Sequence, residues 1–363
     1  HSRCDCWPPM ADRRCRSAEF TIAPHTQVGH LPAQALRLAS VAFAGYAGVT
    51  LPSEGKINWY LARPRMRRDL SMGALTADGQ LVSSVYITLE QMRLGGQLAP
   101  VALVDTVMTD PEYRRHGLAR RVLAAALEAA RRAGADAALL FTVPGSMPYR
   151  FYQTLGFMPV EHIRVLARRG ASLARRGASL ARQSARLTHR GIGLEAGDVR
   201  SASTSDAARL LTFWNHVYGA HEGYVPLDET LWRWRRAERP AVLPSETLFC
   251  EIDEAVVAAV NLCAAPVIGE RSRSLVVTDL AWEPGGPGLE RTRALLQCLP
   301  DDAEARILVP ESDKALGRLI SGDGWYEIGR EAAMLAPLSR EGERRLVSLQ
   351  TPWYALPESV IGV

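Results

Sequence analysis

Three β-prone segments followed by one long helix constrain this chain most. Residues 70–92 read as a hairpin around Asp78-Gly79, and Asp-Gly between two such segments is the strongest short signal for a β-hairpin. The valine-rich residues 98–109 predict a third strand. Residues 117–133, rich in Ala, Leu and Arg, predict a long helix that Gly134 ends. We therefore expect a sheet of adjacent strands with a helix packed on it.

Further elements complete this half of the chain. Residues 19–167 are expected to follow the order β-α-β-β-β-α-β-α-β. The flanking elements are a strand at 19–24, a helix at 32–46, a strand at 137–143, a helix at 147–155 and a strand at 157–167. The expected fold class is α/β (α+β), with a mixed, mostly antiparallel sheet flanked by helices.

The chain is too long for one ordinary domain. Its 363 residues predict two domains. The expected division is a tail at 1–18, a first domain at 19–167, a linker at 168–194, a second domain at 195–340 and a tail at 341–363. The sequence contains no stretch of about 18 apolar residues, so we expect no membrane contact. The net charge of +4 is too small to argue for nucleic-acid binding.

The second half repeats landmarks of the first. Val143-Pro144-Gly145-Ser146 is echoed by Val309-Pro310-Glu311-Ser312, and Leu155-Gly156-Phe157 by Asp323-Gly324-Trp325. A duplicated fold explains this spacing better than chance does, although an unrelated α+β domain is the alternative.

The linker and the cysteines offer weaker signals. Residues 168–174 (Arg-Arg-Gly-Ala-Ser-Leu-Ala) recur at 175–181, which indicates a basic linker or, alternatively, a helix that contacts nucleic acid or membrane. Cys4-Asp5-Cys6 has no second ligand pair at a usable spacing, so no metal site is expected. The absence of a signal-peptide pattern and the scattered cysteines predict a cytoplasmic protein with reduced thiols.

The loop between the third strand and the long helix suits an anion. Gly117 and Ala119 are small, so backbone N–H groups there can approach a ligand closely. A helix N-terminus that follows such a loop attracts negative charge and suits a pyrophosphate. Arg114 and Arg115 add two positive charges at the same place.

Two motifs resemble those of the GNAT (Gcn5-related) N-acetyltransferases. Arg114-x-x-Gly117-x-Ala119 fits the Gln/Arg-x-x-Gly-x-Gly/Ala signature of that family, and the preceding Asp-Pro-Glu-Tyr-Arg is typical of it. Residues 151–157 (Phe-Tyr-Gln-Thr-Leu-Gly-Phe) fit the family's Phe-Tyr-x-x-Leu-Gly-Phe segment. Both motifs occur in the family's order and on the expected elements, so residues 19–167 are identified as a member of this family.

The resemblance implies a site for acetyl-CoA or another acyl-CoA. The third strand would diverge from the strand near Leu139, and backbone groups of Val107 and Thr109 would bond the pantetheine arm. Backbone N–H groups of residues 115–119 would hold the pyrophosphate. The implied cofactor-binding residues are Val107, Met108, Thr109, Arg114, Arg115, His116, Gly117, Leu118 and Ala119.

Two side chains are the implied acid and base. Tyr152 would protonate the leaving thiolate, because the pKa of a phenol lies near that of a thiol; alternatively, it is a packing aromatic. Asp105 interrupts an apolar strand and would take the amine's proton through water, or it is a structural carboxylate. Glu90 is a weaker candidate base, and His116 would contact phosphate or solvent.

The second half departs from the family's pattern. Residues 283–289, which replace the phosphate loop, are two residues shorter and contain no arginine, and Pro287 removes an N–H donor. Ile320 stands at the position of Tyr152. We therefore expect a degenerate GNAT-like domain, in an arrangement similar to that of acyltransferases with tandem GNAT domains.

The second half also holds the stretch richest in aromatic residues. It would line a cleft for a sugar or aromatic substrate, or it forms ordinary core and inter-domain packing. Glu54, Glu222 and Asp228 are weak candidates for attracting a cationic amine. The aromatic and histidine residues are Phe213, Trp214, His216, Tyr218, His221, Tyr224, Trp232 and Trp234.

These expectations describe a CoA-dependent N-acyltransferase that acts by direct attack. The expected acceptor is a primary amine of a small molecule such as an antibiotic or aminosugar. The alternatives are a protein lysine or N-terminal acetyltransferase and a non-catalytic acyl-CoA-binding regulatory module. We expect no nucleic-acid partner, and a monomer or homodimer.

Overall fold

A computed structural model describes residues 20–44, 52–168, 199–266, 273–297, 299, 304–321 and 324–354. The first half contains strands β1 (Thr21–Pro24), β2 (Met72–Leu75), β3 (Leu81–Leu94), β4 (Gln97–Thr109), β5 (Ala137–Thr142) and β6 (Met158–Arg168). Its helices are α1 (Leu31–Ala42), α2 (Glu54–Leu61), α3 (Leu118–Arg132) and α4 (Met147–Gln153). The N-terminal cysteines and residues 169–194 of the predicted linker lie outside the described residues.

The second half repeats this order of elements. Its strands are β7 (Val199–Ser201), β8 (Ser245–Ile252), β9 (Ala255–Pro266), β10 (Arg273–Trp282), β11 (Ala305–Pro310) and β12 (Trp325–Pro337). Its helices are α6 (Ala207–Tyr218), α7 (Glu229–Trp232, continued by a π-helical turn at Arg233–Ala237), α8 (Gly286–Gln297), α9 (Lys314–Ile320) and α10 (Arg340–Val347). Within the described residues, no helix is long and apolar enough to cross a membrane.

Local signals explain most elements of the first half. Gly79 adopts a left-handed φ of 83° in the turn between β2 and β3, and Gly134 does so, at 90°, directly after α3. The Ser146 hydroxyl accepts from the Tyr149 N–H and begins α4. The predicted order is confirmed, with one addition: the sequence analysis missed helix α2.

The described strands form one 12-stranded sheet that both halves share. Its order is β1-β2-β3-β4-β5-β12-β6-β11-β10-β9-β8-β7. Only β4 with β5 and β10 with β11 pair in parallel within the described sheet. The predicted mixed, mostly antiparallel sheet flanked by helices is therefore confirmed, but the halves do not have separate sheets.

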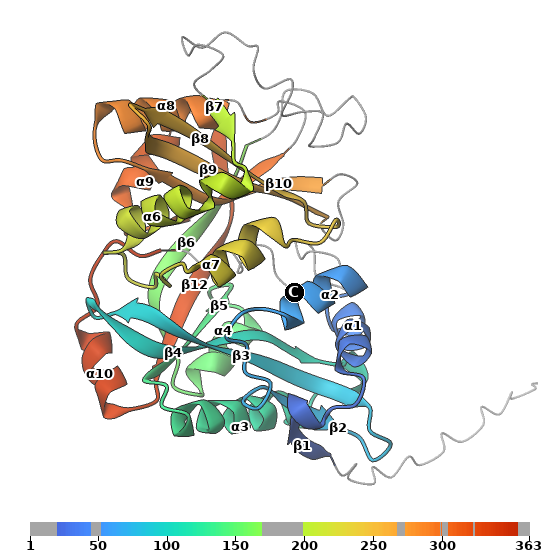
Figure 1. The fold of residues 1–363 in the computed structure, drawn as a ribbon. Coiled ribbons are helices and arrows are strands. Elements are labelled where there is room, and N and C mark those ends of the chain that lie inside the picture. The colour runs from blue at the N-terminus through green and yellow to red at the C-terminus, as the bar shows by residue number, and fades with distance from the viewer. Residues whose placement is uncertain are drawn as a thin grey trace, which may run out of the picture.

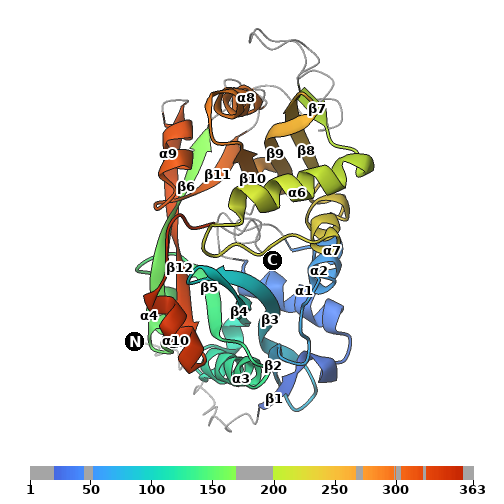
Figure 2. The same cartoon turned by 60° about the vertical axis from the view of Figure 1, so that its left-hand side comes forward.

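The two halves exchange their last strands. β12, from the end of the second half, pairs with β5 of the first half, and β6, from the end of the first half, pairs with β11 of the second. β6 and β12 also pair with each other and lie side by side between the two lobes (Figures 1 and 2). The predicted boundary after residue 167 thus separates the two halves in sequence. In space, strands from both sides of this boundary belong to one continuous sheet.

The largest apolar core lies between the two halves. Helices α1 and α2 of the first half and α6 and α7 of the second contribute to it (Figure 2). Trp59 stacks on Trp234 with ring centroids 4.4 Å apart and an interplanar angle of 4°. Each indole N–H donates to the backbone carbonyl of the other tryptophan, at 3.0 and 2.8 Å. This reciprocal contact fixes α2 against the second half.

The predicted C-terminal tail contributes ordered structure. Residues 340–347 form α10, and Trp353 and Tyr354 are buried, with 2% and 4% exposure. The Glu222 N–H donates to the Pro352 carbonyl at 3.0 Å, and the Tyr354 N–H donates to the Glu222 carbonyl at 2.8 Å. The segment is thus held in the second half by backbone hydrogen bonds.

The exchange of strands predicts that neither half folds alone. Residues 1–168 produced by themselves would lack β12 and would expose the edge of β5 and an apolar face. We expect this fragment to aggregate, and we expect co-production with residues 199–363 to give a soluble one-to-one complex. Size-exclusion chromatography and circular dichroism would test this. A folded, monomeric fragment 1–168 would contradict it.

Candidate active site

Strands β4 and β5 diverge and leave a gap in the sheet. Among the described residues they pair only at 101–103 with 137–139, although β4 continues to Thr109 and β5 to Thr142. We call the gap between residues 104–109 of β4 and 140–142 of β5 the first wedge. The backbone groups of Val107 and Thr109 on this side of β4 have no strand partner within the described residues and are available to a ligand, whereas the Met108 carbonyl faces β3 and accepts from the Ser83 hydroxyl at 2.9 Å.

A β-bulge lies within the first wedge. Ser84 pairs with Met108 and Tyr86 with Asp105, so Thr106 and Val107 together face the single residue Val85. Thr106 has a left-handed φ of 50°. The bulge interrupts the regular alternation of backbone directions along β4. It therefore changes the direction of the backbone N–H and C=O groups where β4 and β5 separate.

The loop after β4 presents a series of unbonded N–H groups. At the start of this loop, the Asp110 carboxylate accepts a hydrogen bond from the Glu112 N–H and thereby shapes the turn. Arg115 and Gly117 have left-handed φ values of 67° and 70°, and residues 114–117 are exposed. Within the described chain no hydrogen bond is found for the backbone N–H groups of residues 115–119. Such a curled loop at a helix N-terminus is an anion-binding concavity.

The other loop residues have distinct positions. Leu118 is buried with 1% exposure and anchors the start of α3 in the core. The His116 Nδ1 lies 3.2 Å from the Tyr113 carbonyl and 3.0 Å from the Arg114 carbonyl. The His116 ring therefore braces the loop, while the Arg114 and Arg115 side chains add positive charge beside it.

Tyr152 and Asp105 lie on opposite faces of the sheet at the first wedge. Tyr152, with 9% exposure, belongs to the core under α3, together with Val104 and Leu140. Asp105 follows Val104 and faces α2, where its Oδ2 lies 3.7 Å from the Arg63 Nη1. The gap is thus approached by a phenol from one face and by a carboxylate from the other.

The surroundings of Asp105 contain a buried polar atom that lacks a hydrogen-bond partner. Asp105 itself is 32% exposed at its side chain. The Arg63 Nε is buried and has no hydrogen-bond partner among the described residues, and the Tyr60 hydroxyl is buried close to the Asp105 carboxylate. Burial first, and then the Asp105 charge, raise the pKa of Tyr60 well above its ordinary value. Unpaired buried polar atoms are uncommon and indicate a place for water or a ligand.

Glu90 is unsuited to act as a base. Its side chain is fully buried, and its Oε2 lies 2.5 Å from the Arg65 Nη1 and its Oε1 3.6 Å from the Arg63 Nη2. A carboxylate held by two guanidinium groups without solvent access serves as their counter-ion. Asp105 is the better placed of the two candidate bases.

The second half contains an equivalent wedge. β10 and β11 pair in parallel only over 275–277 with 305–307 in the described sheet, and Thr278 forms a bulge in β10. Asp279 stands two residues beyond the last parallel pair, as Asp105 does. The Asp279 Oδ2 accepts from the Arg236 Nη2 at 2.8 Å, in a pair that is almost fully buried.

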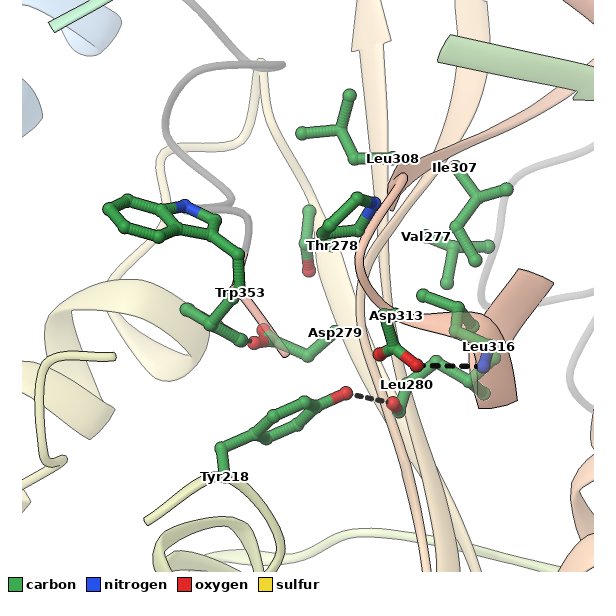
Figure 3. A pocket seen from close by; sticks show the side chains of 12 residues that line it. Tyr218, Val277, Thr278, Asp279, Leu280, Ile307, Leu308, Asp313, Leu316 and Trp353 are labelled. Carbon is green, nitrogen blue, oxygen red and sulfur yellow. Dashed lines mark hydrogen bonds between the residues drawn. The ribbon is translucent and has the colours of Figure 1, made fainter. Parts of the chain in front are cut away.

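The chain's own C-terminal segment fills this second wedge. The Tyr354 hydroxyl donates to the Asp279 Oδ1 at 2.5 Å, and the Trp353 side chain lies beside it. Figure 3 shows Trp353, Asp279 and Tyr218 around the space that remains. That cavity has a volume of about 30 Å³, which suits a water molecule and excludes a pantetheine arm.

The loop after β10 also lacks the anion cradle. Helix α8 begins at Gly286, and the Leu289 N–H is bonded to the Gly285 carbonyl. A Cβ at Gly288 would lie 2.4 Å from the Glu283 carbonyl oxygen, so this loop is packed tightly on itself. Its geometry agrees with the loss expected from the missing arginine and from Pro287.

The aromatic stretch of the second half forms core. Six of its members are buried, whereas His216 is exposed. Glu222 is fully buried and accepts from the Gly95 and Gly96 N–H groups at 2.9 and 2.8 Å, so it fixes the β3–β4 hairpin. Asp228 caps α7 and pairs with Arg65. The buried members are Phe213, Trp214, Tyr218, Tyr224, Trp232 and Trp234.

A family model described as an acetyltransferase (GNAT) domain matches residues 33–160. The first half therefore carries a GNAT acetyltransferase domain. The matched region includes the first wedge, the loop of unbonded N–H groups and Tyr152. No curated protein matches the chain.

Several solved structures share the fold of the chain. One is a conserved protein of unknown function, a probable N-acyltransferase, from Enterococcus faecalis V583 (TM-score 0.62, 16% identity, 90% of this chain and 74% of that one). Another is a GCN5-related N-acetyltransferase from Anabaena variabilis (0.60, 13%, 88% and 73%). A third, from Kribbella flavida, has the same description (0.55, 17%, 89% and 73%). At these identities the likeness shows the fold alone.

The GNAT family uses acetyl-CoA as co-substrate, and the first wedge fits it. The unbonded N–H groups of residues 115–119 match a pyrophosphate, and the free edge of β4 matches an amide-containing arm. Within the described part of the chain, no group of three or more His, Cys, Asp or Glu side chains is placed to hold a metal ion.

Gly117→Glu should abolish measurable binding of acetyl-CoA. The added carboxylate would stand where the phosphates bind, and the φ of 70° strains any side chain at this position. Gly134→Glu is a matched control, because Gly134 also has a positive φ, of 90°, and open space around it at the far end of α3. Isothermal calorimetry that found equal affinities for both variants would rule out the proposed phosphate loop.

The closed second wedge predicts one acetyl-CoA per chain. Calorimetric titration of the intact protein should give a stoichiometry of one, because Trp353 and Tyr354 occupy the second wedge. A stoichiometry of two would show that this segment leaves the wedge when a ligand is present, contrary to the structure.

Proposed function

We propose that the chain is a CoA-dependent N-acyltransferase whose single active site is the first wedge. The observation that carries the proposal is the combination of an anion cradle, a free strand edge and titratable side chains on both faces of the wedge. Together these features would hold an acyl-CoA and supply the proton transfers that accompany acyl transfer to an amine. The GNAT match supports the acyltransferase chemistry.

The proposed reaction is direct attack by the amine. Its nitrogen would bond to the thioester carbonyl carbon, and backbone N–H groups at the Thr106–Val107 bulge would stabilise the charge that develops on the carbonyl oxygen. The carbon–sulfur bond would then break. Tyr152 would give its proton to the thiolate and recover one from solvent, while Asp105 would accept the ammonium proton through water.

We further propose a small-molecule acceptor such as an antibiotic or aminosugar. The face of the sheet that carries Asp105 is covered by the second half, through the stack of Trp59 on Trp234 and the pair of Arg65 with Asp228. Asp105 remains 32% exposed beside this cover. We expect an acceptor that reaches it to fit between the two halves, which favours a compact amine over an extended peptide.

A panel of amines would distinguish the alternatives. Release of CoA from acetyl-CoA would be measured with kanamycin, glucosamine, spermidine and a lysine-containing peptide. Turnover with the first three favours a small-molecule enzyme, and turnover with the peptide alone favours a protein acetyltransferase. Tight binding of acetyl-CoA without turnover on any broader panel would favour a regulatory module.

Tyr152→Phe should lower kcat by about 10-fold or more, because the leaving thiolate would lose its proton donor. The matched control is Tyr149→Phe, which removes a hydroxyl from the same short helix without touching the proposed acid. Full activity of Tyr152→Phe on a good acceptor would refute the assignment of the acid. Unchanged calorimetric affinity for acetyl-CoA would show that the loss concerns the chemical step.

A further inference from the structure

A second hollow lies between helix α9 and strands β6 and β12, and none of its lining residues belongs to the first wedge or to the loop at residues 114–119. Figure 2 shows α9 beside β6. The hollow has a volume of about 520 Å³, within the range of about 300–1,000 Å³ that is usual for small-molecule sites. We call it the α9 pocket. Its charged lining residues are Arg164, Glu311, Asp313, Lys314, Arg318 and Arg330.

The carboxylates at the α9 pocket already have partners. Glu311 accepts from the Arg330 Nη1 at 2.8 Å, and Glu327, beside the pocket, accepts from the Arg330 Nε at 2.6 Å. The Asp313 Oδ1 accepts from the Leu316 N–H at 2.9 Å and thereby caps α9. Arg330 is thus paired with two carboxylates, and the third carboxylate stabilises the start of the helix.

The other three cationic side chains of the pocket have no carboxylate partner. Within the described residues, Arg164, Lys314 and Arg318 form no ion pair. The Lys314 Nζ donates to the backbone carbonyl of Glu311 at 2.5 Å. With Glu327 included, three carboxylates stand against four cationic side chains. The α9 pocket therefore has an excess of positive charge.

Arg164 occupies a constrained position in this pocket. It is half-buried on β6 and lies directly opposite Arg330 of β12, an arrangement of like charges that is unfavourable in a sheet. A Cβ at Gly317 would lie 3.4 Å from the Arg164 Nη2, so the guanidinium lies against α9 at a residue that has no side chain. A guanidinium that is already held in place loses little freedom when it binds an anion.

We propose that the α9 pocket binds the phosphate group of a small molecule other than the acyl-CoA in the first wedge. Arg164 lines the pocket from the sheet, whereas Lys314 and Arg318 line it from the helix. A tetrahedral phosphate presents oxygens in several directions and can accept from both sides, and arginine matches its geometry with paired N–H groups. The volume leaves room for a sugar or nucleoside attached to the phosphate. This site does not depend on the proposed acyltransferase activity.

Calorimetry of the full chain with inorganic pyrophosphate as the probe would test the site, with CoA present at saturation to occupy the first wedge. We expect one pyrophosphate per chain. R164M should weaken its binding by about tenfold or more, because a charged hydrogen-bond donor is lost. R318M should weaken it less, because Arg318 is exposed.

R293M is the matched control. Arg293 is exposed on α8 and forms no ion pair among the described residues, so this variant loses the same charge outside the pocket. It should bind pyrophosphate as the wild type does. Circular dichroism would verify the fold of each variant, and R318M would carry the test if R164M misfolds. Absence of binding to the wild type, or equal affinities of R318M and R293M, would overturn the proposal.

Two variants would separate the α9 pocket from the first wedge. G117E, which is expected to lose acetyl-CoA, should still bind pyrophosphate, and R164M should keep the wild-type affinity for acetyl-CoA. A folded R164M that had lost both ligands would assign the pocket to the CoA site and overturn the proposal. Failure of acetyl-CoA to bind the wild type, with pyrophosphate still bound, would count against the proposed function alone.

Competition would test the chemical class of the ligand. With CoA present, ribose 5-phosphate and glucose 6-phosphate should displace pyrophosphate, whereas glucose should not. Citrate, whose charges are on planar carboxylates, should compete more weakly than either phosphate ester. Citrate that bound more tightly than every phosphate compound would overturn the assignment to phosphate.

Discussion

The antiparallel pairing of β6 with β12 holds the two halves in one sheet. Its register runs from Arg168 beside Trp325 to Met158 beside Leu335, and each strand has its second partner in the opposite half. Removing either strand would leave two unpaired edges in the middle of the molecule. The positions of both wedges depend on this arrangement, because β12 supports β5 and β6 supports β11.

The same backbone device occurs twice with different outcomes. In each half, parallel strands diverge after three pairs, and an aspartate lies two residues further on, opposite an arginine. In the second half, Tyr354 completes the hydrogen bonding of Asp279 and closes the space. In the first half, Asp105 pairs with Arg63 and its side chain remains 32% exposed, whereas the Asp279 side chain is 2% exposed. The closed wedge stabilises the fold, and the open wedge keeps its carboxylate accessible to a ligand.

Most elements and the anion loop could be predicted from the sequence, because their signals are local. Asp78-Gly79 and Gly134 act through backbone conformation, and the residues of the loop after β4 are contiguous. Helix α2 was missed because its buried side includes Lys56, so its sequence shows no simple apolar stripe. The aromatic stretch around Trp214 could not be divided between cleft and core without knowing what packs against it.

The sequence by itself determined the order of the elements and the loop of N–H groups at residues 115–119, since each depends on neighbours in the chain. The tertiary structure decided how the two halves share one sheet, what fills the second wedge, and which groups surround Asp105. Those outcomes depend on contacts between residues far apart in sequence, such as Trp59 with Trp234 and Tyr354 with Asp279. Local propensity does not encode such contacts, because the packing of the whole chain determines which distant groups are buried together.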